Sequence, residues 1–152
     1  MARTKTVKVS SVFPASPDEI WERLTRVETL QYIAAPFASF SPEDPAKEMV
    51  WREGETSKFH LRILGFLSVG AHTIQVRRFD RAAYTIETHE GNKTVPIWNH
   101  RITISQVGKS TSRYTDEVEL GVGWLTGVVY IWSNMFYRHR QRRWVRLLEK
   151  SS

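Results

Sequence analysis

Residues 123–149 predict a single long C-terminal helix, and this helix constrains the fold more than any other feature of the sequence. Apolar side chains recur in its first half at three- and four-residue intervals, which is the spacing of one helix face. They are Leu125, Val128, Val129, Trp132, Met135 and Phe136. At 1.5 Å per residue the helix is about 40 Å long. We therefore expect it to close over a sheet that covers its apolar face.

A membrane span is the alternative interpretation of this segment. Residues 120–137 carry no charge, and a run of eighteen reaches the lower bound for a transmembrane helix. Gly123 and Gly127 also form a G-x-x-x-G pair. Polar side chains interrupt the run, however, and the strand before it would lose its packing partner. A buried helix is favoured, and no transmembrane segment is expected.

The middle of the chain has the pattern of an antiparallel meander. Runs of alternating apolar and polar residues are separated by turn residues at short intervals. The predicted strands are residues 47–52, 56–64, 71–79, 84–90, 96–106 and 113–120. Residues 39–45 contain two prolines and are predicted to be a loop.

The N-terminal part predicts one strand and two short helices. Residues 4–13 alternate as a strand does. Ser16 is a good N-cap, Pro17 suits the first helical position, and Glu19 completes a capping box. A second short helix is expected at residues 30–35, before Pro36. The whole chain, residues 1–152, is thus expected to form one α+β domain, because a chain of this length fits a single core.

This order of elements resembles the START-like superfamily, also called SRPBCC, near its polyketide cyclase/dehydrase-like and uncharacterised ligand-binding members. The resemblance rests on Val12-Phe13-Pro14-Ala15, then Pro17-Asp18-Glu19-Ile20-Trp21, then Thr115-Asp116-Glu117-Val118 before the long helix. It spans residues 4–149 and implies the helix-grip fold, in which a curved antiparallel sheet of about seven strands wraps around the C-terminal helix. It also implies a cavity between them, but not one activity, since such folds host carriers, cyclases and other modules.

Two histidine–carboxylate pairs are expected on the inner face of the sheet. If the last hairpin centres on Gly108, His100 lies opposite Asp116, with Ile102 opposite Tyr114 and Trp98 opposite Val118. The turn at Asp80-Arg81 in the same way places Val76 opposite Ile86 and His72 opposite Glu90. Either pair would anchor a ligand hydroxyl or carbonyl, serve as a general base, or only hold the sheet together.

The predicted ligand-binding residues combine these polar groups with aromatic and apolar neighbours from the sheet and helix. They are His72, Trp98, His100, Tyr114, Asp116, Trp132, Met135 and Phe136. The segment 65–70, which carries Phe66, Leu67 and Val69 between glycines, is expected to be either a mobile gate at the cavity mouth or a buried turn.

Several kinds of chemistry lack a sequence signal. The chain has no cysteine, so disulfides and thiolate metal sites are excluded. The five histidines are scattered, and we expect no metal site, no cofactor and no catalytic residue that the sequence alone identifies. The glycines at 121, 123 and 127 have the wrong spacing for a dinucleotide fingerprint, and no strand follows the helix.

Positive charge is the remaining feature. The net charge is +6, and five arginines crowd the end of the helix. They are Arg138, Arg140, Arg142, Arg143 and Arg146. Such a run is usually a solvated helix end, but it also suits a weak contact with RNA or an anionic membrane. No apolar leader follows Met1, so we expect no signal peptide and favour the cytoplasm.

The sequence therefore predicts binding or transport of a small hydrophobic or aromatic ligand, such as a lipid, quinone or polyketide, between sheet and helix. Two alternatives stay open. One is a cyclase/aromatase or dehydratase in the same cavity, with His100 as base oriented by Asp116. The other is polyanion binding through the arginine-rich helix end.

Overall fold

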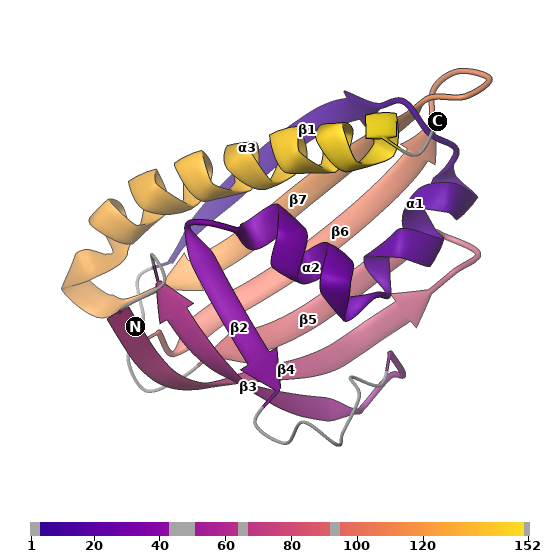
Figure 1. Ribbon diagram of the computed structural model, residues 1–152. Helices are drawn as coiled ribbons and strands as arrows, with labels where there is room; N and C mark the ends of the chain where they lie inside the picture. The colour runs from indigo at the N-terminus through magenta and orange to yellow at the C-terminus, as the bar shows by residue number, and fades with distance from the viewer. Residues whose placement is uncertain (1–3, 43–50, 64–66, 92–94, 151–152) are drawn as a thin grey trace.

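A curved sheet carries three helices on one of its faces (Figure 1). The computed structural model describes residues 4–42, 51–63, 67–91 and 95–150. The strands are β1 (Lys5–Phe13), β2 (Ala38–Pro42), β3 (Thr56–Ile63), β4 (Leu67–Asp80), β5 (Thr85–Gly91), β6 (Ile97–Gln106) and β7 (Ser112–Gly121). The helices are α1 (Pro17–Leu24), α2 (Val27–Ala34), the 3-10 turn η1 (Gly123–Leu125) and α3 (Thr126–Lys150). All neighbouring strands are antiparallel, in the order β1-β7-β6-β5-β4-β3-β2. This is the predicted α+β helix-grip arrangement.

The start of α1 follows the predicted capping signal. The Ser16 hydroxyl accepts a hydrogen bond from the backbone N–H of Glu19 at 3.3 Å, and Pro17 occupies the first helical position. Ile20, Trp21 and Leu24 on the inner face of α1 are buried. The helix is therefore fixed both at its first turn and along its apolar face.

Three local predictions differ from the structure. Residues 39–42 of the segment predicted as a loop belong to β2, because an edge strand with one unpaired side tolerates Pro42, and residues 43–45 lie outside the described residues. The strand predicted at residues 47–52 lies outside the described residues up to position 50, and Trp51 and Arg52 are not in a strand. Leu67 and Val69 belong to β4 rather than to a connecting loop, whereas Phe66 lies outside the described residues.

The predicted strand registers are wrong by a small shift, but the predicted faces are right. His100 lies opposite Val118, and Asp116 lies opposite Ile102. The hairpin loop is longer than a turn centred on Gly108, since the Val107 N–H donates to the Thr111 carbonyl at 3.1 Å. A slip of two residues keeps every side chain on its face, so the histidine and the aspartate become diagonal neighbours.

The pairing of β4 with β5 is shifted in the same way. Val76 lies opposite Thr88 rather than Ile86, and Glu90 lies opposite Ile74 rather than His72. A β-bulge between Val76 and Arg78 adds a residue to β4, and a second bulge interrupts its pairing with β3. Bulges bend a strand and increase its twist, so these two contribute to the curvature that encloses α3.

The interior contains two apolar clusters that lie at opposite ends of α3. The first joins α1 to the C-terminal end of α3, where Trp144 packs on Phe13 and Tyr114 at ring-centroid distances of 5.7 and 5.6 Å. The second joins the N-terminal half of α3 to β1 and β7 through Phe136 and Tyr137. The apolar core is thus divided along the helix.

The apolar pattern predicted the inner face of α3 only in part. Phe136 is buried, and Val129 and Trp132 pack on the second cluster as expected. The buried residues of α3 are Thr126, Ser133, Phe136, Tyr137, Gln141, Trp144 and Leu148. Val128 and Met135 are instead 66% and 58% exposed. Met135 therefore does not face the sheet. Among the described residues, no helix is long and apolar enough to cross a membrane.

Two tryptophans near and on this helix give a matched test of the packing. Trp144 is fully buried, whereas Trp124 is 90% exposed. Trp144→Ala is expected to lower the free energy of unfolding by about 3–5 kcal/mol, because it removes a large side chain from a packed core. Trp124→Ala is expected to change it by less than about 0.5 kcal/mol. Urea unfolding of both variants measures the difference, and equal effects would contradict this orientation of α3.

Candidate functional site

A layer of polar side chains separates the two apolar clusters. Along β7, Tyr114 belongs to one cluster and Val118 to the other, and Asp116 lies between them. Along β6, His100 occupies the same level between Ile102 and Trp98. Other elements contribute polar residues to this layer as well: Ser11 from β1, Thr88 and Glu90 from β5, His72 from β4, and Arg140 and Gln141 from α3.

His100 is at the centre of this polar layer. Its Nε2 lies 2.6 Å from Asp116 Oδ1, and its Nδ1 lies 3.6 Å from Glu90 Oε2. His100 and Asp116 are both buried. The predicted histidine–aspartate contact is therefore present, and both ring nitrogens face carboxylates.

Gln141 joins α3 to the sheet from the other side of Asp116. Its side-chain amide donates to Asp116 Oδ2 at 3.0 Å and to the Val9 carbonyl at 2.8 Å. Its amide oxygen accepts a hydrogen bond from the Ser11 hydroxyl. One buried glutamine thus connects the helix to both β1 and β7.

Glu90 extends the layer to the far strands. Its Oε1 lies 3.1 Å from His72 Nε2, which is the second predicted histidine–carboxylate contact. Its Oε2 accepts a hydrogen bond from the Thr88 hydroxyl at 2.8 Å. A continuous series of contacts therefore runs from β1 to β4 across the inner face of the sheet.

The charges in this layer stabilise one another. Burial alone lowers the pKa of His100, but the hydrogen bonds to Asp116 and Glu90 outweigh it and raise that pKa above its ordinary 6.5. Burial alone raises the pKa of Glu90, but the hydrogen bonds from His100 and His72 outweigh it and hold that pKa well below its ordinary 4.5. The two carboxylates therefore both favour the protonated form of His100.

Arg140 enters the layer from α3. Its guanidinium carbon lies 5.0 Å from the centre of the Tyr137 ring and 5.7 Å from that of Phe136. Burial by itself lowers the pKa of Arg140, but the interactions with Tyr137 and Asp116 outweigh it, so the group remains a cation. Its Nε is shielded from solvent and has no hydrogen-bond partner among the described residues.

Tyr137 lies beside Arg140, at the border between the polar layer and the second apolar cluster. Its hydroxyl accepts a hydrogen bond from Trp98 Nε1 at 3.2 Å. Its ring lies 5.1 Å from the ring of His100. Burial raises the pKa of Tyr137 far above its ordinary value, so the hydroxyl keeps a proton that it can donate.

The predicted site residues do not all meet. His72, His100 and Asp116 belong to the polar layer, and Trp98, Phe136 and Trp132 surround its edge near Tyr137. Tyr114 instead packs inside the first cluster, and Met135 faces outward. The gate function predicted for Phe66, Leu67 and Val69 stays a prediction.

The sequence interpretation missed Tyr137, Arg140 and Gln141. The apolar pattern places only apolar residues on the inner face of the helix, and the charge pattern predicts the arginines to be a solvated end or a polyanion contact. The signal that could have identified these three residues is the position along the strands at which polar side chains point toward α3. Ser11 and Asp116 both hydrogen-bond Gln141, which lies about one turn after Tyr137 on α3.

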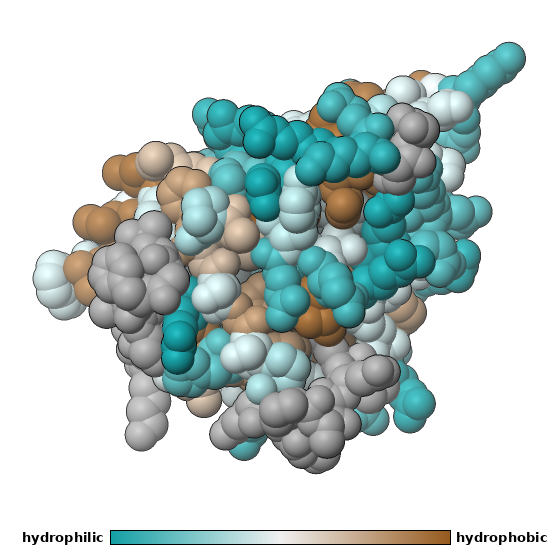
Figure 2. All heavy atoms as spheres, viewed as in Figure 1, coloured by the Kyte–Doolittle hydropathy of each residue, from teal (hydrophilic) through white to brown (hydrophobic). Residues whose placement is uncertain are grey.

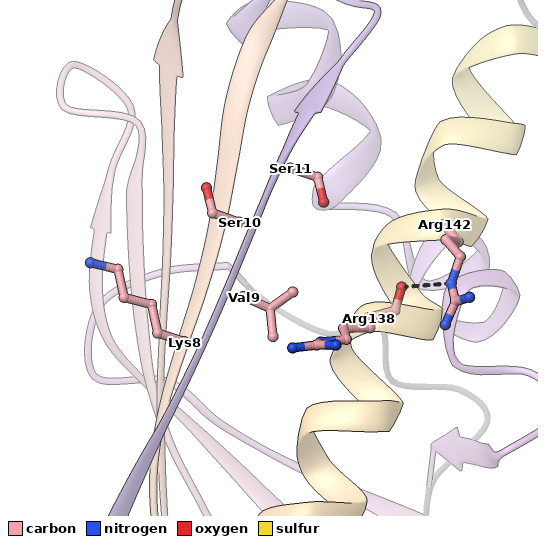
Figure 3. Close-up of a pocket in the computed structure, with 6 residues that line it drawn as sticks. All are labelled: Lys8, Val9, Ser10, Ser11, Arg138 and Arg142. Carbon is pink, nitrogen blue, oxygen red and sulfur yellow. Dashed lines mark hydrogen bonds between the residues drawn. The ribbon is translucent and has the colours of Figure 1, made fainter.

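An open groove lies between β1 and the outer part of α3, and Ser11 of the polar layer is one of its lining residues. It has a volume of about 470 Å³ and is lined by Lys8, Val9, Ser10, Ser11, Arg138 and Arg142 (Figure 3). Arg138 points toward β1 in this view, and the Arg142 side chain donates to the Arg138 carbonyl at 3.4 Å. None of the predicted ligand-binding residues lines this groove.

The coupled charges predict how stability depends on pH. The raised pKa of His100 contributes stability that is present below about pH 6.5 and is lost as the pH rises through the folded value. The lowered pKa of Glu90 contributes stability that is present above about pH 4.5 and is lost as the pH falls. Stability should therefore be highest between these two values. The wild-type free energy of unfolding should be lower at about pH 8.5 than at about pH 5.5, and His100→Gln should remove most of this difference. Urea unfolding at the two pH values measures it.

His89→Gln is the matched control, because His89 is exposed on the neighbouring strand. This variant should lose as much free energy of unfolding between the two pH values as the wild type does. A His100→Gln protein with the full wild-type loss would contradict the role given to His100. NMR titration of the histidine rings in the unmodified protein gives a second test, with one ring expected to titrate above 6.5.

Solved structures share this fold at low sequence identity. A START superfamily protein from Mycobacterium smegmatis has a TM-score of 0.72 and 14% identity, with 97% of this chain and 99% of that chain covered. Norcoclaurine synthase from Thalictrum flavum, in complex with dopamine and hydroxybenzaldehyde, has a TM-score of 0.70 and 12% identity, with 99% and 90% covered. TTHA0849 from Thermus thermophilus has a TM-score of 0.73 and 12% identity, with 97% and 99% covered. No curated protein matches the chain.

These likenesses confirm the START-like fold that the sequence predicted. One family model matches residues 11–148, which is most of the chain. The protein therefore belongs to the family described as Domain of unknown function (DUF8410), and its fold is START-like.

Proposed function

We propose that the protein binds a small, largely apolar or aromatic molecule between the sheet and α3, through an oxygen atom that accepts hydrogen bonds from Arg140. The observation that carries this proposal is the shielded guanidinium Nε of Arg140, which has no hydrogen-bond partner among the described residues. The proposed ligand supplies that partner.

The cost of leaving the shielded Nε–H group of Arg140 without an acceptor supports this function. A buried polar group without a partner costs about 1–3 kcal/mol, and more when the group is charged. The nearest carboxylates already have other partners, because Asp116 contacts His100 and Gln141, and Glu90 contacts His72. An oxygen acceptor on a ligand would satisfy Arg140 without breaking these contacts.

The surroundings of Arg140 indicate what the rest of the ligand is like. Tyr137 offers a second donor, and Phe136 and Trp132 stack on each other at 4.9 Å beside it. These rings favour an apolar or aromatic body with one polar end. Lipids, quinones and polyketides all have such a body and carry carbonyl, carboxyl or hydroxyl oxygens. Arg140 disfavours a cationic ligand.

The polar layer supports binding more than catalysis. A general base needs a nitrogen that is open to the substrate, whereas both ring nitrogens of His100 face carboxylates. His100 thus fixes the layer that surrounds Arg140. The aromatic molecules named with norcoclaurine synthase belong to that protein, and they are consistent with an aromatic ligand for this fold.

The first experiment is native mass spectrometry of the freshly purified protein, followed by organic extraction of the bound material. The proposal predicts a co-purifying mass that is lost on denaturation and that contains at least one carbonyl, carboxyl or hydroxyl group. A bound molecule that is a cation, or a hydrocarbon without oxygen, would contradict the role given to Arg140.

A matched pair of probes tests the site directly. Menadione is a naphthoquinone, and 2-methylnaphthalene is the same ring system without the carbonyls. The chain has no cysteine that menadione could modify. Because a hydrogen bond to a charged group contributes about 1.5–3 kcal/mol, Arg140→Gln should weaken menadione binding roughly 10- to 150-fold. Isothermal titration calorimetry measures this, and binding of 2-methylnaphthalene should hardly change.

Arg142→Gln is the matched control on the same helix, since Arg142 is exposed. It should leave the affinity for menadione unchanged. Equal losses in the two variants would point to a general effect of positive charge and would overturn the proposed site.

A further inference from the structure

Four large apolar side chains lie exposed along one face of η1 and α3. They are Trp124, Val128, Ile131 and Met135, with exposed fractions of 90%, 66%, 64% and 58%. Their spacing of four, three and four residues places them in one line along the helix. We call these four residues the apolar stripe.

The apolar stripe faces away from the sheet and packs on neither apolar cluster. Figure 2 shows the corresponding brown surface at the left end of the molecule, over the first turns of α3, whereas teal covers the rest of the helix. Single exposed apolar residues are ordinary, but a contiguous row with a nearly fully exposed tryptophan marks an interaction surface.

The same helix face continues as a basic surface. Arg138 and Arg142 follow Met135 at the same three- and four-residue spacing, and both are exposed. Glu149 is the single acidic residue of α3. Lys8 and Ser10 also line the groove between α3 and β1, but each has a partner on β7. Lys8 Nζ lies 3.6 Å from Glu117, and the Ser10 hydroxyl lies 3.1 Å from the Thr115 hydroxyl. Arg138 and Arg142 together therefore supply the positive charge at this end of the stripe.

We propose that this outer face of α3 docks on an anionic membrane surface. The helix lies in the plane of the interface, with the apolar stripe inserted at the level of the acyl chains and Arg138 and Arg142 against the lipid phosphates. An apolar row that contains Trp, next to arginines on the same helix, is the composition of such interfacial helices. The net charge of +6 gives the whole protein an attraction to anionic lipid.

Charge complementarity favours a membrane over a second copy of the chain. Parallel pairing of two such faces would bring the arginines of both copies together, and antiparallel pairing would overlap only the four residues of the apolar stripe. A stable interface needs about 20–30 residues on each side. A nucleic acid would use the arginines, but it has no contact to offer Val128, Ile131 and Met135.

Vesicle co-sedimentation tests the proposal. The protein should bind vesicles of phosphatidylcholine with roughly 30% phosphatidylserine and should bind vesicles of phosphatidylcholine alone much more weakly. Trp124→Ser with Ile131→Ser should weaken binding at least about tenfold, because two apolar anchors are lost. Arg138→Ser with Arg142→Ser should weaken it about 30-fold, at roughly 1 kcal/mol for each cation.

The matched controls lie elsewhere on the surface. Val12→Ser with Val107→Ser removes two apolar residues that are 47% and 50% exposed, and should leave binding unchanged. Lys109→Ser with Arg113→Ser removes two exposed charges and should weaken binding less than the helix pair does. All of these residues are exposed, so circular dichroism is expected to show every variant folded.

Three results would overturn this proposal. The first is no binding to anionic vesicles. The second is binding that is weakened by the arginine substitutions but not by the substitutions in the apolar stripe, which indicates a nonspecific polyanion contact. The third is a stripe-dependent dimer, measured by analytical ultracentrifugation, which would assign the stripe to a second copy. Arg140→Gln should not alter vesicle binding, so this proposal and the proposed ligand site succeed or fail separately.

Discussion

The contact between His100 and Asp116 is the interaction on which the rest of the structure depends. A buried charge is costly unless it is paired and hydrogen-bonded. Here the His100 ring lies between the carboxylates of Asp116 and Glu90, and Gln141 donates to the other oxygen of Asp116. Since the paired groups come from β5, β6, β7 and α3, the position of the helix over the sheet is fixed by polar contacts as well as by apolar packing.

The same layer divides the interior into parts with different roles. The cluster around Trp144 is packed by rings from β1 and β7, and it holds the C-terminal half of α3 in place. The cluster around Tyr137 borders the polar layer, where Arg140 lies with a shielded donor. In the proposed site, the ligand would meet aromatic rings on one side and the Arg140 cation on the other, which is a combination that orients a mostly apolar molecule by one polar end.

Three faces of α3 carry three kinds of contact. The inner face packs on the sheet, and a lateral face contacts α2, where Arg143 donates to the Tyr32 carbonyl at 3.1 Å and stacks on its ring. His139 contacts the Ala35 carbonyl at 2.6 Å on the same side. Only the remaining face is open to solvent. The arginines therefore do not act as one cluster, because Arg140 and Arg143 are used within the fold.

Much of the fold could be predicted because it depends on periodicity. Alternation assigned the inner faces of β6 and β7 correctly even though the register was wrong, since a slip of two residues conserves the face. Hydrophobicity predicted the inner face of α3 correctly at Phe136 and Trp132 but not throughout, because the interior next to the polar layer is polar. Met135 is apolar and exposed, whereas Gln141 is polar and buried. Which of these two residues is buried depends on the contacts between α3 and the sheet, not on their hydrophobicity.

The site could be predicted only in part for the same reason. His100 and Asp116 are visible as polar residues on an apolar face, whereas Arg140 resembles its neighbours in a basic run. What distinguishes Arg140 is its position one turn after Tyr137, on the inner side of the helix. That position follows from the helix phase and not from the local sequence.

The most direct test of the central claim is the side-chain NMR signal of the Arg140 Nε–H group during titration with menadione. The account predicts that this resonance shifts with the same saturation curve as the binding itself, and that 2-methylnaphthalene leaves it nearly unchanged. If menadione binds while the Arg140 resonance stays in place, the ligand does not reach the polar layer and the proposed site is wrong.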